Sequence, residues 1–373
     1  MKKILELEQI LRKANQNKLF IKEVTAFGYQ YNYNTNVISS ISKYWFHDCE
    51  IEEIIAPLNS ESSNNNRPGT IKESTEYVVV HDTASSAVTA DEYAHARYVQ
   101  NGGGGTSWHY SVGSKMSIHQ IPDDEVAYHA GDSLDVRFEL TKTNVLGINK
   151  NPIVTIIDDY YAFDGVKSNI HIPVVTYVKK NGKLVFASDG VTQGKEVKNP
   201  NEEIKLTTED INDAGIRVDL KEDGYYYIGP TYYNATYKKI ANRGGNLNSI
   251  GIETMINEGS NLMKTWHRNA KLVAKLLVDN NLDLSRVKPH HFFSGKPCPH
   301  TLRYNKLWDY FLECLEIEYT ILKDYNDVKI ELIDYPKFVD SDGLVNEYSD
   351  QAFTYTIKLS YKDYTKEIKL EIN

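Results

Sequence analysis

Two short apolar runs, each next to a residue that can carry chemistry, constrain the fold most strongly. Residues 76–80 read EYVVV and are followed by His81, and residues 249–255 read SIGIETM and contain Glu253. Short runs rich in β-branched residues are typical of buried strands. Functional side chains often lie where strands end on a sheet scaffold. We therefore expect a central sheet with His81 at a functional edge.

Helical patterns accompany these strands. Residues 89–92 (TADE) fit a capping box, which predicts a helix that ends at the glycines 102–105. Residues 261–280 place apolar side chains along one side of a helix. A further helix is expected from residue 304 to about residue 323. The sequence thus predicts an α/β fold, with a mixed central β-sheet flanked by helices.

Length and local composition predict the domain organisation. A chain of 373 residues is longer than one ordinary compact domain. Residues 1–70 predict an N-terminal extension with a short helix, a β-rich segment and a polar linker. Residues 71–325 predict the main domain, interrupted by a β-rich insertion at 133–245 that is rich in Tyr, Val, Ile, Asn and Gly. Residues 326–373 alternate polar and apolar side chains, which predicts a small C-terminal β module.

Charge and cysteine content narrow the function classes. The formal net charge of -9 argues against nucleic acid as the main partner, because phosphate binding needs a basic face. Three cysteines without regular spacing do not make a disulfide framework, so free or metal-bound thiols are expected. Glu6 and Glu8 interrupt the apolar region that a signal peptide would need. No run approaches the roughly 20 apolar residues of a membrane span.

One loop combines the ligand types that zinc prefers. Residues 290–300 read HHFFSGKPCPH, in which a glycine and two prolines favour a tight turn. A catalytic zinc site has three protein ligands and one open position. His81 is the candidate ligand from elsewhere in the chain. A single His at a strand end, or a single loop Cys, is also common in purely structural roles. Spacing alone therefore leaves the zinc site and the packing role both open.

Five motifs in order resolve this choice through a resemblance. The stretches YVVVHDTASS, SWHYSVG, VAYHAGD, NSIGIE and HHFFSGKPCPH resemble the type 2 N-acetylmuramoyl-L-alanine amidases. That family includes phage endolysins and relatives of the peptidoglycan recognition proteins. The resemblance covers about residues 76–132 and 246–322. It implies the zinc amidase core, one zinc per chain, and hydrolysis of the amide between N-acetylmuramic acid and L-alanine in bacterial peptidoglycan.

The resemblance also implies the roles of individual residues. Three positions match the family's zinc ligands: His81, His290 and Cys298. Glu253 matches the general base of the family branch that uses a glutamate, which takes a proton from water and passes it to the leaving amine. Lys296 matches the loop lysine that stabilises the oxyanion of the tetrahedral intermediate.

Three further residues are expected to bind substrate: Trp108, His129 and Asn248. Some family members have a catalytic Tyr where Trp108 stands, and Trp has no acidic hydroxyl to replace it. We therefore assign Trp108 to packing or to stacking on sugar, and a structural loop role stays open for His129. Phe292 stands where the family often has Asp, so a hydrogen bond that orients a zinc ligand must be supplied differently.

Two other functions remain as alternatives. The first is a non-catalytic module that binds peptidoglycan or muropeptides on the same fold, and the presence of Cys298, Lys296 and Glu253 favours the enzyme over it. The second is an interaction protein with a structural zinc, which would need a fourth protein ligand. With no signal peptide or transmembrane segment, we expect synthesis in the cytoplasm and action on the cell wall after lysis or non-classical release. Phage endolysin and cellular autolysin are not distinguished.

Overall fold

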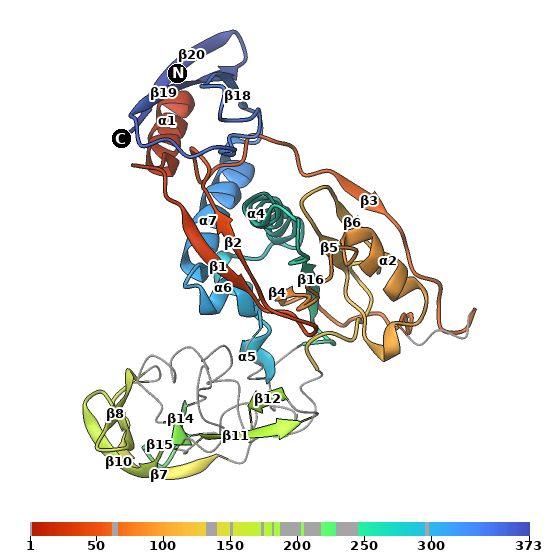
Figure 1. Ribbon diagram of the computed structural model, residues 1–373, viewed down its shortest axis with the longest axis vertical. Coiled ribbons are helices and arrows are strands. Elements are labelled where there is room, and N and C mark those ends of the chain that lie inside the picture. The colour runs from red at the N-terminus through yellow and green to blue at the C-terminus, as the bar shows by residue number, and fades with distance from the viewer. Residues whose placement is uncertain are drawn as a thin grey trace. The chain divides into compact units, whose positions relative to one another are not determined.

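The computed structural model describes residues 2–61, 66–131, 140–149, 152–172, 175–180, 183–186, 203–204, 218–228, 245–294 and 298–373 (Figure 1). The chain divides into two compact units. The first unit comprises Met1–His129, Asn248–Lys288 and His300–Asn373. The second unit comprises Ala130–Leu247 and Pro289–Pro299.

A six-stranded sheet forms the centre of the first unit, with the order β17-β4-β16-β5-β6-β3. Its strands are β3 (Ile51–Glu53), β4 (Tyr77–Asp82), β5 (Tyr110–Val112), β6 (Ser117–His119), β16 (Ser249–Thr254) and β17 (Val287–Pro289). Strand β16 runs parallel to both β4 and β5, whereas β5 and β6 are antiparallel. The prediction of a mixed α/β fold with a central mixed sheet is therefore confirmed.

The two apolar runs of the sequence are neighbouring central strands. Val78 to Val80 on β4 are fully buried, as are Ile250 and Ile252 on β16. The strands pair in register from Ser249 beside Tyr77 to Thr254 beside Asp82. Each buried Val or Ile side chain contributes roughly 1.5–3 kcal/mol relative to exposure. Burial therefore holds the carboxyl ends of β4 and β16 side by side.

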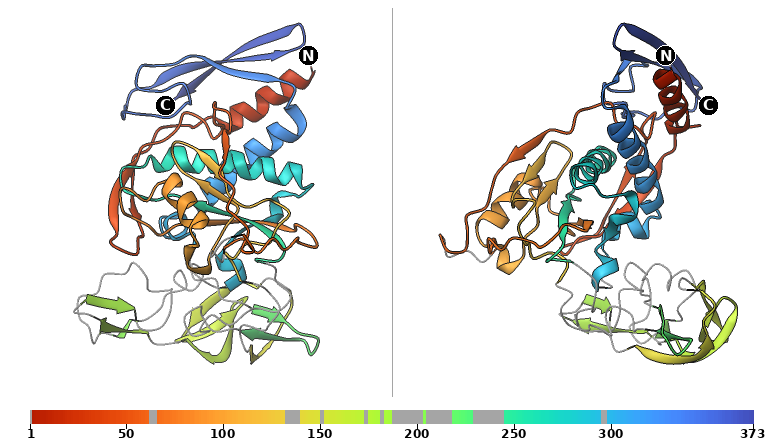
Figure 2. Two further views of the ribbon diagram at one scale, coloured as in Figure 1. Left: turned by 90° about the vertical axis from the view of Figure 1, so that its right-hand side faces the viewer. Right: turned by 180° about the vertical axis from the view of Figure 1, so that it is seen from behind.

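Helices pack against this sheet within the first unit. Helix α4 (Leu262–Asp279) begins after Asn261, whose side chain accepts a hydrogen bond from the Lys264 amide, and its apolar face joins the core of β4 and β16. Helix α7 (Trp308–Tyr325) packs on α4 and contributes Phe311 and Leu315 to the same core. Figure 2 shows α4 and α7 as neighbouring helices.

The remaining helices of this unit are shorter. Helix α2 (Glu92–Gln100) is capped by Asp91, whose carboxylate accepts from the Ala94 amide. The capping box that begins at Thr89 is therefore wrong, because the side chain that satisfies the first turn belongs to Asp91. This unit also contains the 3-10 turns η1 (Gly103–Gly105) and η3 (Leu284–Arg286) and the helix α6 (His300–Tyr304).

The two ends of the chain share a second core. Helix α1 (Lys2–Ala14) buries Ile4, Leu7 and Leu11 against a three-stranded antiparallel sheet. That sheet consists of β18 (Lys329–Asp334), β19 (Phe353–Tyr361) and β20 (Tyr364–Ile372). Figure 1 shows both termini beside it. The antiparallel hairpin of β1 (Lys22–Ala26) and β2 (Tyr33–Val37) contributes Val24, Ala26 and Val37 to the core of the central sheet.

The described part of the second unit consists of short strands and the one-turn helix α5 (His291–Ser294). The strands form three-stranded sheets with the orders β10-β9-β8, β12-β11-β13 and β14-β15-β7. Their bounds are β7 (Thr141–Leu146), β8 (Val154–Ile157), β9 (Tyr160–Phe163), β10 (Val166–His171), β11 (Val175–Lys180), β12 (Lys183–Phe186), β13 (Glu203–Ile204), β14 (Val218–Leu220) and β15 (Tyr225–Ile228). Phe163 and Tyr226 are central to its small apolar core.

Across the described ranges, none of the helices has the length and apolar character needed to cross a membrane.

Candidate metal centre

Three predicted ligands lie at the ends of regular elements. His81 is the penultimate residue of β4, and His290 directly follows β17, which neighbours β4 in the sheet. Cys298 comes two residues before α6. The strand ends and the start of α6 thus set where these three residues can lie.

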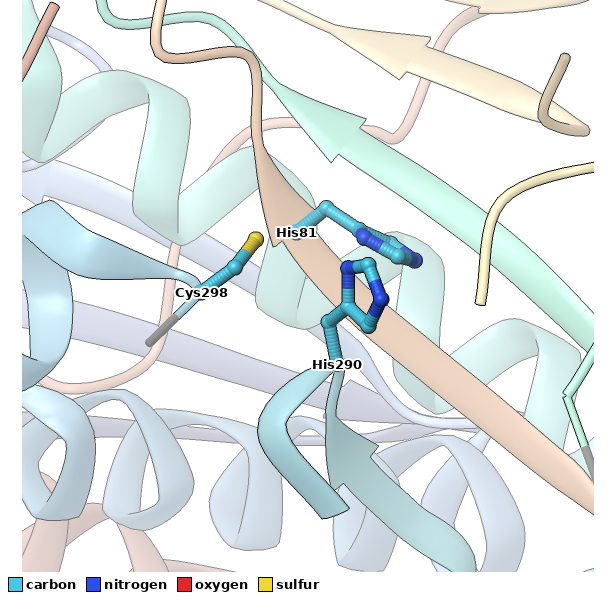
Figure 3. Close-up of side chains that lie close together, drawn as sticks. All are labelled: His81, His290 and Cys298. Atoms are coloured by element: carbon cyan, nitrogen blue, oxygen red, sulfur yellow. The ribbon is translucent and has the colours of Figure 1, made fainter. Parts of the chain in front are cut away.

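The three side chains converge. The candidate ligand atoms of His81, His290 and Cys298 all lie within 4.8 Å of one another, and Figure 3 shows the two imidazoles and the thiol pointing toward a common point. Their exposed fractions are only 1%, 8% and 2%. Two imidazoles and a thiol are a donor set that zinc prefers, and three protein ligands leave a fourth position open. The sequence prediction named these same three residues.

Glu253 lies beside this cluster on the neighbouring strand. It pairs with His81 in the parallel register of β16 and β4, so both side chains lie on one face of the sheet. Its Oε1 is 3.8 Å from His81 Nδ1. Its side chain is 14% exposed, and the Oε2 atom of its carboxylate is buried. The predicted base and the predicted ligand are therefore brought together.

His129 contacts the opposite side of the His81 ring. The distance from His129 Nδ1 to His81 Nε2 is 3.0 Å, which identifies a hydrogen bond. Because Nε2 is engaged in this way, Nδ1 is the nitrogen of His81 that faces Glu253. Burial lowers the pKa of His129 to about 3, so its ring is neutral at ordinary pH.

A glycine on β16 makes room for the His129 ring. A Cβ on Gly251 would lie 2.6 Å from ring atoms of His129, which is far inside contact distance. On the same strand, the Ser249 hydroxyl lies 3.4 Å from His129 Nε2. The apolar motif SIGIE therefore forms a core strand and also provides the space for the ring of His129, which contacts His81.

Asp82 is a site residue that the sequence reasoning missed. Its Oδ2 accepts a hydrogen bond of 2.7 Å from the Thr301 amide, and its Oδ1 lies 3.7 Å from His300 Nδ1. These contacts tie the end of β4 to the start of α6, just after Cys298. The adjacent pair His81-Asp82 at a strand end was the available signal. Its partner Thr301 lies 219 residues away in the sequence, and no local pattern indicates this contact.

The structure also describes the other two predicted substrate residues, Trp108 and Asn248. Trp108 is 6% exposed in a small apolar cluster with Val99 and Ile121, and its Nε1 donates to Ser111 Oγ at 2.8 Å. This is the placement of a packing residue. Asn248 precedes β16, and its carbonyl accepts from the Glu76 amide at 2.8 Å. It lies five residues before Glu253, about 16 Å along an extended strand. The substrate contacts of Trp108 and Asn248 stay predictions.

Lys296, the predicted oxyanion residue, lies outside the described residues.

Fold and site together define a mixed α/β protein with a candidate metal centre. Residues 72–169 match the model of the Amidase_2 family, described as N-acetylmuramoyl-L-alanine amidase. The matched range includes His81, Trp108 and His129, and it ends before Glu253, His290 and Cys298. It covers about a quarter of the chain.

Curated relatives carry the same description. The N-acetylmuramoyl-L-alanine amidase XlyA of Bacillus subtilis (strain 168) is 46% identical over 68 residues, which are 18% of this chain and 23% of that protein. The N-acetylmuramoyl-L-alanine amidase CwlH of the same organism is 41% identical over 70 residues, 19% of this chain and 28% of that protein. The chain thus spans about a quarter of the length of these relatives. These matches confirm the resemblance to N-acetylmuramoyl-L-alanine amidases.

Solved structures were also compared with the chain. The catalytic domain of XlyA has 22% sequence identity and a TM-score of 0.39, covering 71% of this chain and 99% of that one. The structure of PlyL has 16% identity and a TM-score of 0.38, covering 71% of this chain and 96% of that one.

Proposed function

We propose that this chain is a zinc-dependent N-acetylmuramoyl-L-alanine amidase, which hydrolyses the amide between N-acetylmuramic acid and L-alanine in bacterial peptidoglycan. The observation that carries the proposal is the buried cluster of His81, His290 and Cys298, with Glu253 in register beside His81. The family match and the amidase relatives support the choice of substrate.

The residues of the cluster fit zinc by their donor chemistry. Two neutral imidazoles and one thiolate would hold one zinc per chain and leave it with net positive charge. A zinc ion in such a site lowers the pKa of bound water toward about 7 and polarises a carbonyl oxygen. The hydrogen bond between His81 Nε2 and His129 Nδ1 would keep the His81 ring in the orientation that binding requires, because a metal-binding histidine commonly donates its other ring N–H to a partner.

Protein side chains would carry the proton steps. Glu253 would accept the proton of the attacking water and pass it to the leaving amine of L-alanine, because its carboxylate lies next to His81. Lys296 would stabilise the negative charge that develops on the carbonyl oxygen. The role of Lys296 rests on the motif HHFFSGKPCPH alone. The substrate contacts proposed for Trp108 and Asn248 rest on the motifs SWHYSVG and NSIGIE.

Digestion of purified peptidoglycan tests the proposal directly. The expected products are stem peptides with a free L-alanine amino group and glycan strands whose muramic acid has lost its peptide. Chelator-treated protein and the variant Glu253→Gln should release neither product. New reducing sugar ends, or peptide cuts within the stem, would identify another kind of hydrolase.

The non-catalytic alternative is tested by the same preparation. A binding module would sediment with insoluble peptidoglycan and leave its chemistry unchanged over long incubation. Cys298 and Glu253 favour the enzyme, because a module that only binds has no need for a third metal ligand beside a carboxylate. We further propose that the chain reaches the wall after lysis or by non-classical release, and that its amidase domain spans 71–325, with 1–70, the 133–245 insertion and 326–373 as additions.

A further inference from the structure

The tip of the β1–β2 hairpin, residues 27–32, lies against the loop after β4 and against α6 in the first unit. The Tyr29 amide donates to the Ala84 carbonyl at 2.6 Å, and Ala84 follows His81 by three residues. The Phe27 amide donates to Thr301 Oγ1 at 3.4 Å, and Thr301 lies in α6, just after Cys298. Figure 1 shows the hairpin reaching the end of β4.

The hairpin tip approaches the loop after β4 so closely that a glycine is required. A Cβ on Gly28 would lie 2.2 Å from Ser86 Oγ and 2.6 Å from the Tyr31 carbonyl oxygen. The tip is also closed internally, because the Gly28 amide donates to Asn32 Oδ1 at 3.1 Å. These contacts pack the tip tightly against the loop after β4.

Two tyrosine rings are exposed on this fixed tip. Tyr29 is 77% exposed and Tyr31 is 41% exposed. The Tyr31 hydroxyl donates to the Ser86 carbonyl and to Glu258 Oε2, both at 3.0 Å, so its ring orientation is set while part of its surface stays open. A tyrosine ring offers an apolar face with a polar rim, and the apolar C–H face of a sugar ring covers such a surface well. Rigid aromatic rings also lose little entropy on binding.

We propose that Tyr29 and Tyr31 form a carbohydrate subsite that binds the glycan strand of the substrate beside the scissile amide. The subsite rests on the proposed amidase function for the identity of its ligand. Ala84 lies at most about 10 Å along the chain from His81, so a sugar at the tip would be a close neighbour of the muramic acid at the metal cluster. The hairpin lies outside residues 72–169, so this contact is an addition to the segment that matches the amidase family.

Binding is measured without turnover, in the full-length Glu253→Gln protein titrated with tetra-N-acetylchitotetraose by NMR or calorimetry. Adding Tyr29→Ala should weaken binding about fivefold or more, the scale of one lost aromatic contact. Tyr29→Phe should retain most of the affinity, because it keeps the ring. The matched control is Tyr348→Ala, which removes a 46% exposed tyrosine near the C-terminal sheet. Equal affinity of the Tyr29→Ala and Tyr348→Ala proteins would overturn the subsite.

Kinetics in the otherwise wild-type protein separate a subsite from a structural role. Tyr29→Ala should raise KM more than it lowers kcat on peptidoglycan with long glycan strands. The loss in kcat/KM should be smaller on a muramoyl dipeptide that carries a single sugar. Equal losses on both substrates would show a structural effect instead. If peptidoglycan is not cut at all but the tetrasaccharide binds through Tyr29, the amidase proposal fails and the carbohydrate subsite stands.

Discussion

Glu253 and His81 are register partners on adjacent parallel strands, with Glu253 Oε1 3.8 Å from His81 Nδ1. Both residues are placed by the backbone of β16 and β4, whose apolar side chains are fully buried. Their separation is therefore set by sheet geometry and does not depend on a loop. A proposed base and a proposed ligand gain the most from such a scaffold, because misplacement of about 1 Å can cost two orders of magnitude in rate.

The first prediction concerns Glu253. The substitution Glu253→Gln keeps the shape of the side chain but removes the proton acceptor, so turnover of peptidoglycan should fall at least about a hundredfold. Zinc content and thermal midpoint should stay close to wild type. The exposed Glu76→Gln, near the start of β4, is the matched control and should retain full activity. Near wild-type turnover of the Glu253→Gln protein would assign the proton transfer to another group.

The second prediction concerns the metal. Wild-type protein should contain one zinc per chain, and the triple variant of His81, His290 and Cys298 to alanine should contain almost none. The control is His171→Ala, which removes an exposed imidazole from the second unit. Elemental analysis by mass spectrometry after dialysis gives the stoichiometry. Stoichiometric zinc in the triple variant would show that the metal binds elsewhere.

The third prediction concerns the seat of His129. In Gly251→Ala the new methyl group would overlap the His129 ring, so the variant should lose roughly 1–3 kcal/mol of unfolding free energy. It should also bind zinc more weakly, by about 10- to 100-fold, since His81 loses its hydrogen-bond partner. Chemical unfolding and competition with a chelator measure the two effects.

A double-mutant cycle isolates the cause of these losses. In the His129→Ala background the methyl group of Gly251→Ala has space, so its cost should largely disappear. If Gly251→Ala destabilises both backgrounds equally, the backbone of β16 and not the histidine requires the glycine.

The fourth prediction concerns pH and the buried Glu318. Burial raises the pKa of this carboxyl from its ordinary value of 4.5 to about 7, although Lys271 at 3.6 Å opposes the shift. The folded state therefore holds the proton more tightly than the unfolded state. The contribution of Glu318 to stability should be full below about pH 4.5 and should be lost as the pH rises to about 7.

The measurement compares urea unfolding of wild type and Glu318→Gln between pH 4.5 and 8. The unfolding free energy of wild type minus that of the variant should fall across this range and level off above pH 7. Lys271, Tyr44 and the Trp45 amide face the same carboxyl and are unchanged in the comparison. A difference that stays flat or rises with pH would show that Glu318 is ionised throughout.

Local patterns predicted the regular elements of the first unit well. The run at 76–80 overlaps β4 from Tyr77 onward, and the periodic segment 261–280 is α4 to within one residue at each end. These elements are visible in the sequence because burial on one side of a helix, or on a central strand, repeats with a fixed period. The segment from 304 to 323 is α7, which begins later, at Trp308, because α6 occupies His300–Tyr304.

Contacts between distant segments were not predictable in this way. Nothing local in residues 22–37 shows that their hairpin tip reaches Ala84 and Thr301. The same holds for Asp82, whose partner is set by the fold. The metal ligands were found by resemblance, because their spacing is compatible with ordinary structural roles. His129 was expected at the substrate groove, and its contact with His81 depends on the absent side chain of Gly251.

The shared core of the two chain ends makes them one folding unit. Ile4, Leu7 and Leu11 cover the same apolar surface as Tyr355, Ile357 and Ile368. A protease that removed residues 1–17 would remove α1 from that core. The apolar face of β18, β19 and β20 would then be exposed to solvent. Proteolytic removal of either end would therefore unfold the other end. Any tag or binding module fused at one end must leave both ends docked if the fold is to persist.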